Sequence, residues 1–225
     1  MQKPTTLQDQ FATTITNDSF GGLAIIGMNW GDGGGKAAVS GHAAPEQAGL
    51  FTDPNNRYPY STRLTKWFEL WGHPIIPGGP LDRSISQTNV FLDSSKRFCD
   101  VRRDPSKWAE AVRQRGQALA TIRPAGVIFL SIPTMVYAFW AATQSNAQEW
   151  IDLFGVPEWG ELLKFGHRER FRIQFATMSG VPIVGMTHPA ARGVSNVDVT
   201  GARLVMERWI DEVAPGSRSQ GVSAK

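Results

Sequence analysis

Four short, largely apolar segments constrain the fold of this chain more than any other feature of its sequence. They lie at residues 23–28, 88–92, 126–130 and 182–186. Runs that are continuous rather than alternating are typical of strands covered on both faces, as in a parallel sheet. Because stretches with helical spacing separate the runs, the sequence predicts an α/β fold. We expect a three-layer sandwich with a central, mostly parallel four-stranded sheet.

The stretches between the runs carry the end signals of helices. We expect helices at 61–71, at 105–121, at 133–147, and from Asn196 or Asp198 to just before Pro215. Asp104 is placed to cap the second helix, with Pro105 at its first helical position. No repeat or linker composition divides the chain, so we expect a single domain over 1–215. A small, polar and disordered tail would follow at 216–225.

Length and composition exclude several classes of protein. A chain of 225 residues with 41% hydrophobic residues can build a core, which excludes wholesale disorder. The single cysteine, Cys99, excludes a disulfide framework, a four-thiolate iron–sulfur cluster and the usual structural zinc sites. The first eighteen residues lack a secretory pattern, and the apolar stretch 125–142 is interrupted by Ser131 and Pro133. We therefore expect a cytoplasmic monomer that has no membrane contact.

The formal net charge of +3 conceals an uneven distribution. Residues 1–60 carry three basic and five acidic side chains, whereas residues 96–123 carry eight basic and three acidic ones. A second basic cluster consists of Lys164, Arg168, Arg170 and Arg172, with Glu169 among them. Such clusters either meet phosphates of a nucleic acid or form a solvated helix face, and both interpretations stay open here.

Polar residues follow three of the predicted strands, at the sheet edge where ligands bind in parallel sheets. These segments are 27–36, 88–93 and 186–192. The first is rich in glycine, but a P-loop would need Gly in place of Trp30 and Ser or Thr in place of Ala37. The spacing of Gly31, Gly33 and Gly35 also differs from a dinucleotide-binding fingerprint. These glycines either make a turn or let the backbone approach a flat ligand.

Two of these strand ends resemble the signature motifs of the uracil-DNA glycosylase superfamily. The residues are Gly27, Met28, Asn29, Trp30 and Gly31 in one motif, and His188, Pro189, Ala190, Ala191 and Arg192 in the other. They are most similar to Gly-Met-Asn-Pro-Gly and His-Pro-Ser-Pro-Arg in the single-strand-selective monofunctional branch. The resemblance spans roughly residues 23 to 210. It implies an enzyme that acts on DNA without a metal or an organic cofactor.

The resemblance implies two catalytic residues. Asn29 would position the attacking water, because an amide can orient water for a strongly electrophilic sugar cation without taking its proton. His188 would donate a hydrogen bond to the base carbonyl oxygen as negative charge develops on the leaving base. From the residues alone, a histidine before Pro189 is equally compatible with a turn that it caps.

The resemblance also implies residues that bind the substrate. Asn89 would offer a donor and an acceptor to the edge of the pyrimidine, although a strand-end amide with no ligand fits the pattern as well. Arg192, with Ala191 beside it, would enter the gap that a flipped nucleotide leaves in DNA. A solvated or phosphate-contacting arginine is the alternative for Arg192. The remaining pocket residues implied by the first motif are Gly27, Met28, Trp30 and Gly31.

Two departures from the family pattern bear on the substrate. Trp30 stands in place of the family proline, and its ring would either stack on a base or pack in the core. Gly31 stands where the strictly uracil-specific branch places a tyrosine that blocks the C5 side of the base. Our hypothesis is therefore a pocket that accepts uracil or a C5-modified cytosine, such as the glucosylated hydroxymethylcytosine of phage DNA. The enzyme would serve repair of DNA damage by base excision, or antiviral defence.

Two other classes of function remain open at this point. A hydrolase of small nucleosides or nucleotides would share an α/β fold and a polar pocket, but it would not need the basic clusters or Arg192. A non-catalytic DNA-binding module would keep the fold and the basic surface without the chemistry. Binding to DNA without any base release would distinguish the module from the monofunctional DNA glycosylase.

Overall fold

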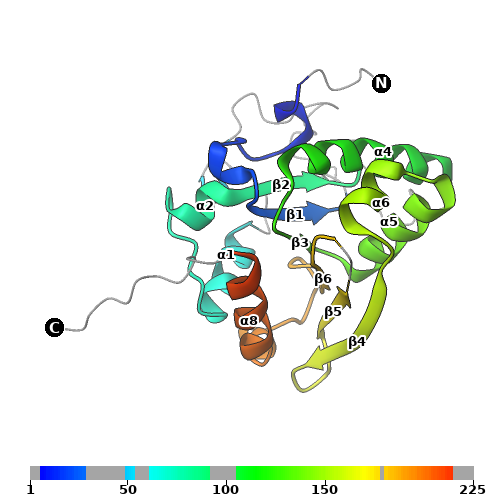
Figure 1. Ribbon diagram of the computed structural model, residues 1–225. Helices are drawn as coiled ribbons and strands as arrows, with labels where there is room; N and C mark the ends of the chain where they lie inside the picture. Colours follow the sequence, from blue (N-terminus) through cyan, green and yellow to red (C-terminus); the bar gives the residue numbers. More distant parts are fainter. Residues whose placement is uncertain (1–5, 29–48, 54–60, 92–104, 178–179, 215–225) are drawn as a thin grey trace, which may run out of the picture.

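A six-stranded sheet forms the centre of the molecule (Figure 1). The computed structural model describes residues 6–28, 49–53, 61–91, 105–177 and 180–214. The strand order is β2-β1-β3-β6-β5-β4, in which the first four strands are parallel and the last two run antiparallel to their neighbours. The predicted α/β class is confirmed, whereas the predicted number of four strands is wrong.

The four parallel strands are buried along their whole length. They are β1 (Leu23–Gly27), β2 (Ile85–Asn89), β3 (Gly126–Phe129) and β6 (Ile183–Met186). Three of them lie within the ranges that the apolar runs predict. The exception is β2, which begins three residues before the predicted start at Thr88 and ends at Asn89.

The shift of β2 has a physical cause in the segment that covers its outer edge. Gln87 is buried because its carbonyl accepts a hydrogen bond from Ala12 N–H at 2.7 Å, and its own N–H donates to Thr13 Oγ1 at 2.9 Å. Thr88 Oγ1 likewise donates to the carbonyl of Gln10 at 2.6 Å. Because the backbone of Gln87 and the hydroxyl of Thr88 are paired in this way, this part of a strand of polar sequence can be buried, so apolarity alone misplaces the strand.

A buried arginine continues this polar edge. Arg115 is fully buried on the helix that covers this side of the sheet, and it donates to the carbonyl of Gln10 at 2.9 Å and to Thr88 Oγ1 at 3.2 Å. Burial lowers the pKa of Arg115 to about 10, so the group remains charged at neutral pH. This member of the first basic cluster therefore holds the N-terminal segment in place and cannot meet DNA.

The two strands that the sequence did not predict form a hairpin at the other edge of the sheet. They are β4 (Glu158–Phe165) and β5 (Phe171–Thr177). The second basic cluster lies on this hairpin, which excludes the interpretation of that cluster as a helix face. Charged and apolar residues alternate from Arg170 to Ile173, the pattern of a strand with one solvated face, and a search for continuous apolar runs passes over it.

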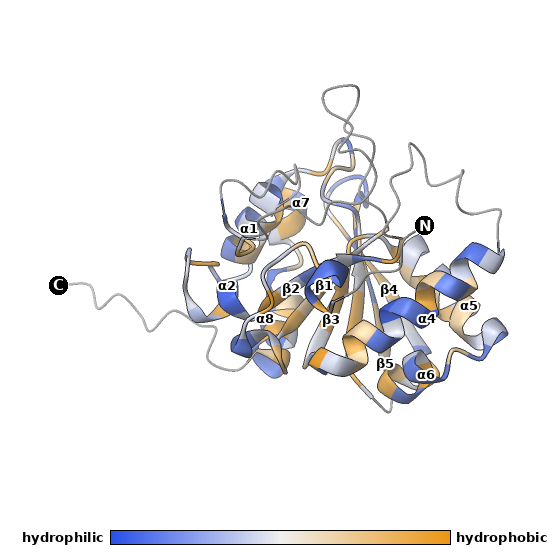
Figure 2. Cartoon of the chain, turned by 90° about the horizontal axis from the view of Figure 1, so that it is seen from above, coloured by the Kyte–Doolittle hydropathy of each residue, from blue (hydrophilic) through white to orange (hydrophobic). Residues whose placement is uncertain are grey.

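Helices cover both faces of the sheet and complete three layers (Figure 2). One face packs against α4 (Pro105–Ile122), α5 (Ile132–Ser145) and α6 (Gln148–Phe154). The other packs against α1 (Ser61–Leu70), α2 (Pro80–Ser84), α7 (Asn196–Thr200) and α8 (Arg203–Val213). Each face buries large aromatic side chains, among them Trp108 and Trp150 on the first and Trp67 and Trp71 on the second.

The helix boundaries agree with the sequence in most places. The one C-terminal helix that we expected is two helices, and Ser195 caps the first of them: its Oγ accepts from Asp198 N–H at 3.3 Å, and the Asp198 carboxylate accepts from Ser195 N–H at 2.7 Å. This capping box at Ser195 satisfies two N–H groups at once, which favours a helix start at Asn196. The expected cap Asp104 and the tail 216–225 lie outside the described residues.

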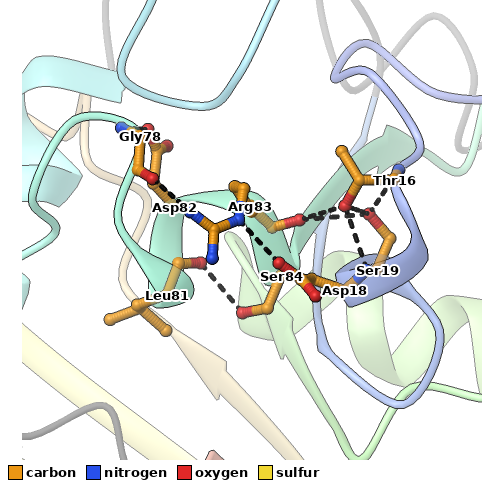
Figure 3. Close-up of polar contacts among 8 residues, drawn as sticks. All are labelled: Thr16, Asp18, Ser19, Gly78, Leu81, Asp82, Arg83 and Ser84. Carbon is orange, nitrogen blue, oxygen red and sulfur yellow. Dashed lines mark hydrogen bonds and ion pairs between the residues drawn. The ribbon is translucent and has the colours of Figure 1, made fainter.

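A polar cluster anchors the chain just before β2 (Figure 3). Arg83 Nε donates to Asp18 Oδ2 at 2.7 Å, and the carbonyl of Arg83 accepts from Thr16 Oγ1 at 2.9 Å. Asp82, fully buried, accepts from Gly78 N–H at 2.8 Å. Together with the short 3-10 helix η2 (Asn17–Ser19), these contacts hold the chain just before Ile85, where β2 begins.

No helix in the described ranges combines the length and the apolar composition that crossing a membrane requires.

Candidate functional site

The described parts of the three predicted site segments lie along the carboxyl edge of the parallel strands. Asn89 ends β2 and is paired in register with Gly27, which ends β1. His188 follows β6 by two residues. Three strand spacings separate β2 from β6, so the backbones of Asn89 and His188 are on the order of 15 Å apart. This edge is where a parallel sheet of this kind presents ligand-binding groups.

The side chain of Asn89 is the most unusual feature of this edge. It is only 1% exposed, yet neither its Oδ1 nor its Nδ2 has a hydrogen-bond partner among the described residues. Leaving a buried donor or acceptor unpaired costs about 1–3 kcal/mol. An amide with both atoms unpaired is therefore arranged to accept partners that the described part of the chain does not supply.

Gly27 and Met28 lie directly beside Asn89. The carbonyl of Gly27 accepts from Val90 N–H at 3.0 Å, and that of Met28 accepts from Phe91 N–H at 2.8 Å. Register partners in a parallel pair share a face, so Gly27 adds no side chain next to the Asn89 amide. Met28 is half-buried and packs against the core on the α4 side. The contacts of Met28 with the described residues are therefore packing contacts.

The other residues of the first motif, Asn29, Trp30 and Gly31, lie outside the described residues. Their predicted roles as water-positioning and pocket-lining residues stay predictions.

The ring of His188 is held in one tautomer. Its Nδ1 accepts a hydrogen bond from Ala190 N–H at 3.0 Å, so the neutral ring carries its proton on Nε2. Burial lowers the pKa of His188 below its ordinary value of 6.5, which favours the neutral form at physiological pH. The ring is therefore arranged to donate one hydrogen bond through Nε2.

An arginine from α1 fixes the loop that carries His188. Arg63 Nη1 donates to the carbonyl of Pro189 at 2.5 Å, and Arg63 Nη2 donates to the carbonyl of Val194. The guanidinium also lies 5.5 Å from the centre of the Trp67 ring, which is fully buried in the core. Because one guanidinium bridges both ends of the loop, residues 189–194 are tied to the core of the molecule.

Ala191 and Arg192 lie on the outer side of this loop. Ala191 is half-buried and its N–H donates to the carbonyl of His188 at 2.8 Å, which closes a turn. Arg192 is exposed and forms no ion pair with the described residues. The position leaves the Arg192 side chain available to a ligand that approaches this edge.

A pocket of about 360 Å³ opens beside His188. It is lined by Ser131, Ile132, Pro133, Leu162, Arg170, Arg172, Met186, Thr187 and His188. The start of α5 forms one wall and the β4–β5 hairpin forms another, so the pocket lies on the hairpin side of His188. Asn89 is not one of its lining residues.

Three arginines shape this edge. The sequence places Arg170 and Arg172 in a basic cluster but not at the site, and it gives no indication of Arg63. The alternation of Arg170 and Arg172 with Phe171 and Ile173 is a strand signal that could have placed the two arginines on one face. The sequence holds no comparable signal for Arg63, because its contacts are with carbonyls more than 120 residues away.

The described residues contain no group of three or more His, Cys, Asp or Glu side chains that could hold a metal ion.

No protein-family model matches the chain, and no curated protein matches it either.

Proposed function

We propose that this protein is a monofunctional DNA glycosylase, which hydrolyses the bond between deoxyribose and a flipped-out pyrimidine and leaves an abasic site. The observation that carries the proposal is the buried, unpaired amide of Asn89 at the same sheet edge as His188. An amide offers one acceptor and two donor hydrogens, which suits the mixed donor and acceptor edge of a pyrimidine. A bound base would recover the free energy that the unpaired amide costs the folded protein.

The state of His188 supports the chemical step. Cleavage of the glycosidic bond moves an electron pair from the bond to the base, so negative charge appears on the base carbonyl oxygen. A neutral imidazole with its proton on Nε2 can donate a hydrogen bond to that oxygen without giving up the proton. Because this hydrogen bond strengthens as charge develops, it stabilises the transition state more than the ground state.

Water completes the reaction on the sugar. It adds to the anomeric carbon of the sugar cation, and a proton passes to the departing base or to solvent. In this proposal Asn29 orients that water, and Arg192 enters the gap in the DNA left by the flipped nucleotide. The exposure of Arg192 at the site edge is compatible with that task.

The proposal extends to the substrate and the setting. Gly31 offers no side chain on the C5 side of the base, so the pocket would accept uracil and also a C5-modified cytosine, including the glucosylated hydroxymethylcytosine of phage DNA. We propose a cytoplasmic monomer that serves DNA repair or defence against phage, with DNA as its partner.

An excision panel tests the proposal. Matched single- and double-stranded oligonucleotides would carry uracil, hydroxymethylcytosine or glucosylated hydroxymethylcytosine at one position, and alkali-labile strand breakage would report base release. We expect release by the wild type and loss of release by His188→Ala. Binding without release from any oligonucleotide would contradict the proposal and indicate a non-catalytic module. Hydrolysis of free nucleosides alone would indicate a small-molecule hydrolase instead, and release of uracil alone would overturn the C5 hypothesis.

A further inference from the structure

Two arginines of the β4–β5 hairpin line the same pocket as His188. Arg170 precedes β5 by one residue and Arg172 is its second residue, so their side chains leave the strand on the same face, two positions apart. Phe171 between them points to the opposite face and is fully buried. Burial of Phe171 against the core thereby sets the direction of both guanidinium groups.

The backbone of these arginines is joined to the strand that carries His188. Arg172 N–H donates to Thr187 Oγ1 at 2.8 Å, and Thr187 N–H donates to the carbonyl of Arg172 at 2.9 Å. Thr187 Oγ1 in turn donates to the carbonyl of Arg170 at 3.1 Å. Thr187 directly precedes His188, so the arginines and the histidine are held in a common frame.

The loop after His188 makes room for one of the guanidinium groups. Arg170 Nη1 donates to the carbonyl of Gly193 at 3.2 Å. Gly193 has a φ of +79°, and a Cβ at this position would lie 1.7 Å from Arg170 Nη1. Only glycine therefore permits Arg170 to lie against this loop.

The positive charges of Arg170 and Arg172 are not neutralised by ion pairs within the described structure. Neither Arg170 nor Arg172 forms an ion pair with a described carboxylate, and their side chains donate only to backbone carbonyls. Glu169, the acidic residue of the hairpin turn, is instead paired with Lys164 at 2.8 Å. Hydrogen bonds from Ser195 and, to a smaller extent, the charge of Arg170 lower the pKa of Asp198. A hydrogen bond from Lys164 and, to a smaller extent, the charge of Arg172 lower the pKa of Glu169. Each of these two carboxylates therefore already has a closer partner, Ser195 for Asp198 and Lys164 for Glu169.

We infer that Arg170 and Arg172 form a phosphate-binding subsite in this pocket. Resting on the proposed function, its occupant is the backbone phosphate of the DNA strand next to the flipped nucleotide. Guanidinium groups bind phosphate oxygens in a fork geometry, and this pair presents two such groups in one concave pocket of about 360 Å³. The start of α5, from Ser131 to Pro133, forms the facing wall of the same pocket.

The subsite would locate the reacting nucleotide. A phosphate held by the hairpin is fixed relative to His188 through Thr187. The base is joined to that phosphate through the sugar, so it has a restricted set of positions. Binding energy spent on a non-reacting phosphate in this way orients the bond that breaks. We therefore expect the loss of either arginine to weaken DNA binding and also to slow base release from bound DNA, because the bond that breaks is then less well oriented.

Charge replacement combined with removal of single phosphate charges tests this inference. Arg170→Gln and Arg172→Gln would be compared with wild type, and Arg168→Gln would serve as the matched control, because Arg168 lies in the same hairpin but does not line the pocket. Binding would be titrated on single-stranded oligonucleotides in which one neutral methylphosphonate replaces each phosphate around the target base in turn. These titrations need no base release.

We expect one methylphosphonate position, adjacent to the target, to weaken wild-type binding on the order of tenfold and to have no further effect in Arg172→Gln or Arg170→Gln. Each of these variants should also lower the slope of log K against log salt concentration by about 0.7. Arg168→Gln should retain the position-specific effect. If the two pocket variants retain it as well, the inference is overturned.

Two further outcomes separate this inference from the proposed function. Normal base release with no loss of binding in either pocket variant contradicts the subsite alone. A position-specific phosphate effect in a protein that releases no base supports the subsite and contradicts the glycosylase proposal.

A titration with inorganic phosphate tests whether the occupant is the DNA backbone. If inorganic phosphate shifts the NMR resonances of Arg172 in wild type but does not compete with the oligonucleotide, the assignment to the DNA backbone is contradicted.

Discussion

The two halves of the sheet differ in almost every respect. All the residues of β2, β1, β3 and β6 are buried, and parallel neighbours pair with them along their length. In β4, by contrast, most residues are exposed, and the strand forms one edge of the sheet. The parallel half carries Asn89 and leads into His188, whereas the antiparallel half carries Arg170 and Arg172.

The difference indicates a division of tasks between the halves. The parallel strands hold a few polar groups in fixed positions inside a packed core, where an unpaired amide is costly and can be selective. The hairpin holds solvated charges, which cost little when nothing is bound and can attract an anionic ligand. We therefore expect changes in the parallel half to alter stability and chemistry, and changes in the hairpin to alter binding.

The largest expected effect concerns stability. Phe129 on β3 is fully buried, so Phe129→Ala should lower the free energy of unfolding by about 3–5 kcal/mol. Trp159 on β4 is 42% exposed and touches the ring of Phe139 at one edge, so Trp159→Ala should cost no more than about 1 kcal/mol. Urea unfolding of both variants measures the contrast. Equal losses would remove the distinction between the two halves.

The next effect concerns chemistry. His188→Ala should lower single-turnover base release by about 10²- to 10³-fold, because one hydrogen bond to the developing charge is lost. Its affinity for an oligonucleotide should stay close to that of wild type, in contrast to Arg172→Gln. A variant that releases base normally would exclude His188 from the reaction.

A smaller effect should follow when the loop after His188 is released from the core. Arg63→Gln removes a guanidinium that bridges the carbonyls of Pro189 and Val194, at a cost of about 1–3 kcal/mol in unfolding free energy. Base release should fall as well, since the loop positions His188, and Arg63→Lys should restore less than half of the loss. Hydrogen exchange at Ala191 and Val194 would report the loosened loop. Unchanged exchange at these residues would contradict the role of Arg63.

The smallest effect is a dependence on pH. Burial lowers the pKa of His188 in the folded protein below 6.5, so below that pH the unfolded chain takes up the proton first. The free energy of unfolding should therefore fall as the pH drops from 6.5 through the folded-state pKa, and this loss is absent above 6.5. His188→Asn should lose less stability than wild type over that interval in urea titrations. Parallel curves for the two proteins would contradict the burial of this ring.

The sequence predicts the parallel half well because its signal is local. Continuous apolar runs mark β1, β3 and β6 within a residue or two, as the burial of each strand on both faces demands. The position of β2 depends on partners far along the chain, Gln10 and Thr13, which no local pattern reveals. The hairpin was missed because its residues alternate and are charged, which resembles a solvated surface.

The site was predicted in part for the same reason. Asn89 and His188 follow strands, and a strand that ends in a polar residue is visible in the sequence. The unpaired state of the Asn89 amide and the tautomer of His188 depend on tertiary contacts, so only the folded chain reveals them. The arginines of the pocket were seen as a cluster, but their convergence on His188 follows from the register of β5 against β6.

The central claim is that the unpaired amide of Asn89 exists for a ligand. Ser86 provides the matched control, because its hydroxyl is also fully buried in β2 without a partner among the described residues, while its side chain faces the opposite side of the sheet. Single-turnover base release should be compared in wild type, Asn89→Ala and Ser86→Ala, with unfolding free energies measured in parallel.

We predict that Asn89→Ala loses base release on the order of 10²-fold while its unfolding free energy stays equal to or above that of wild type, since the cost of an unpaired amide disappears. Ser86→Ala should retain wild-type release. Wild-type release by Asn89→Ala, or an equal loss in both variants, would contradict the account.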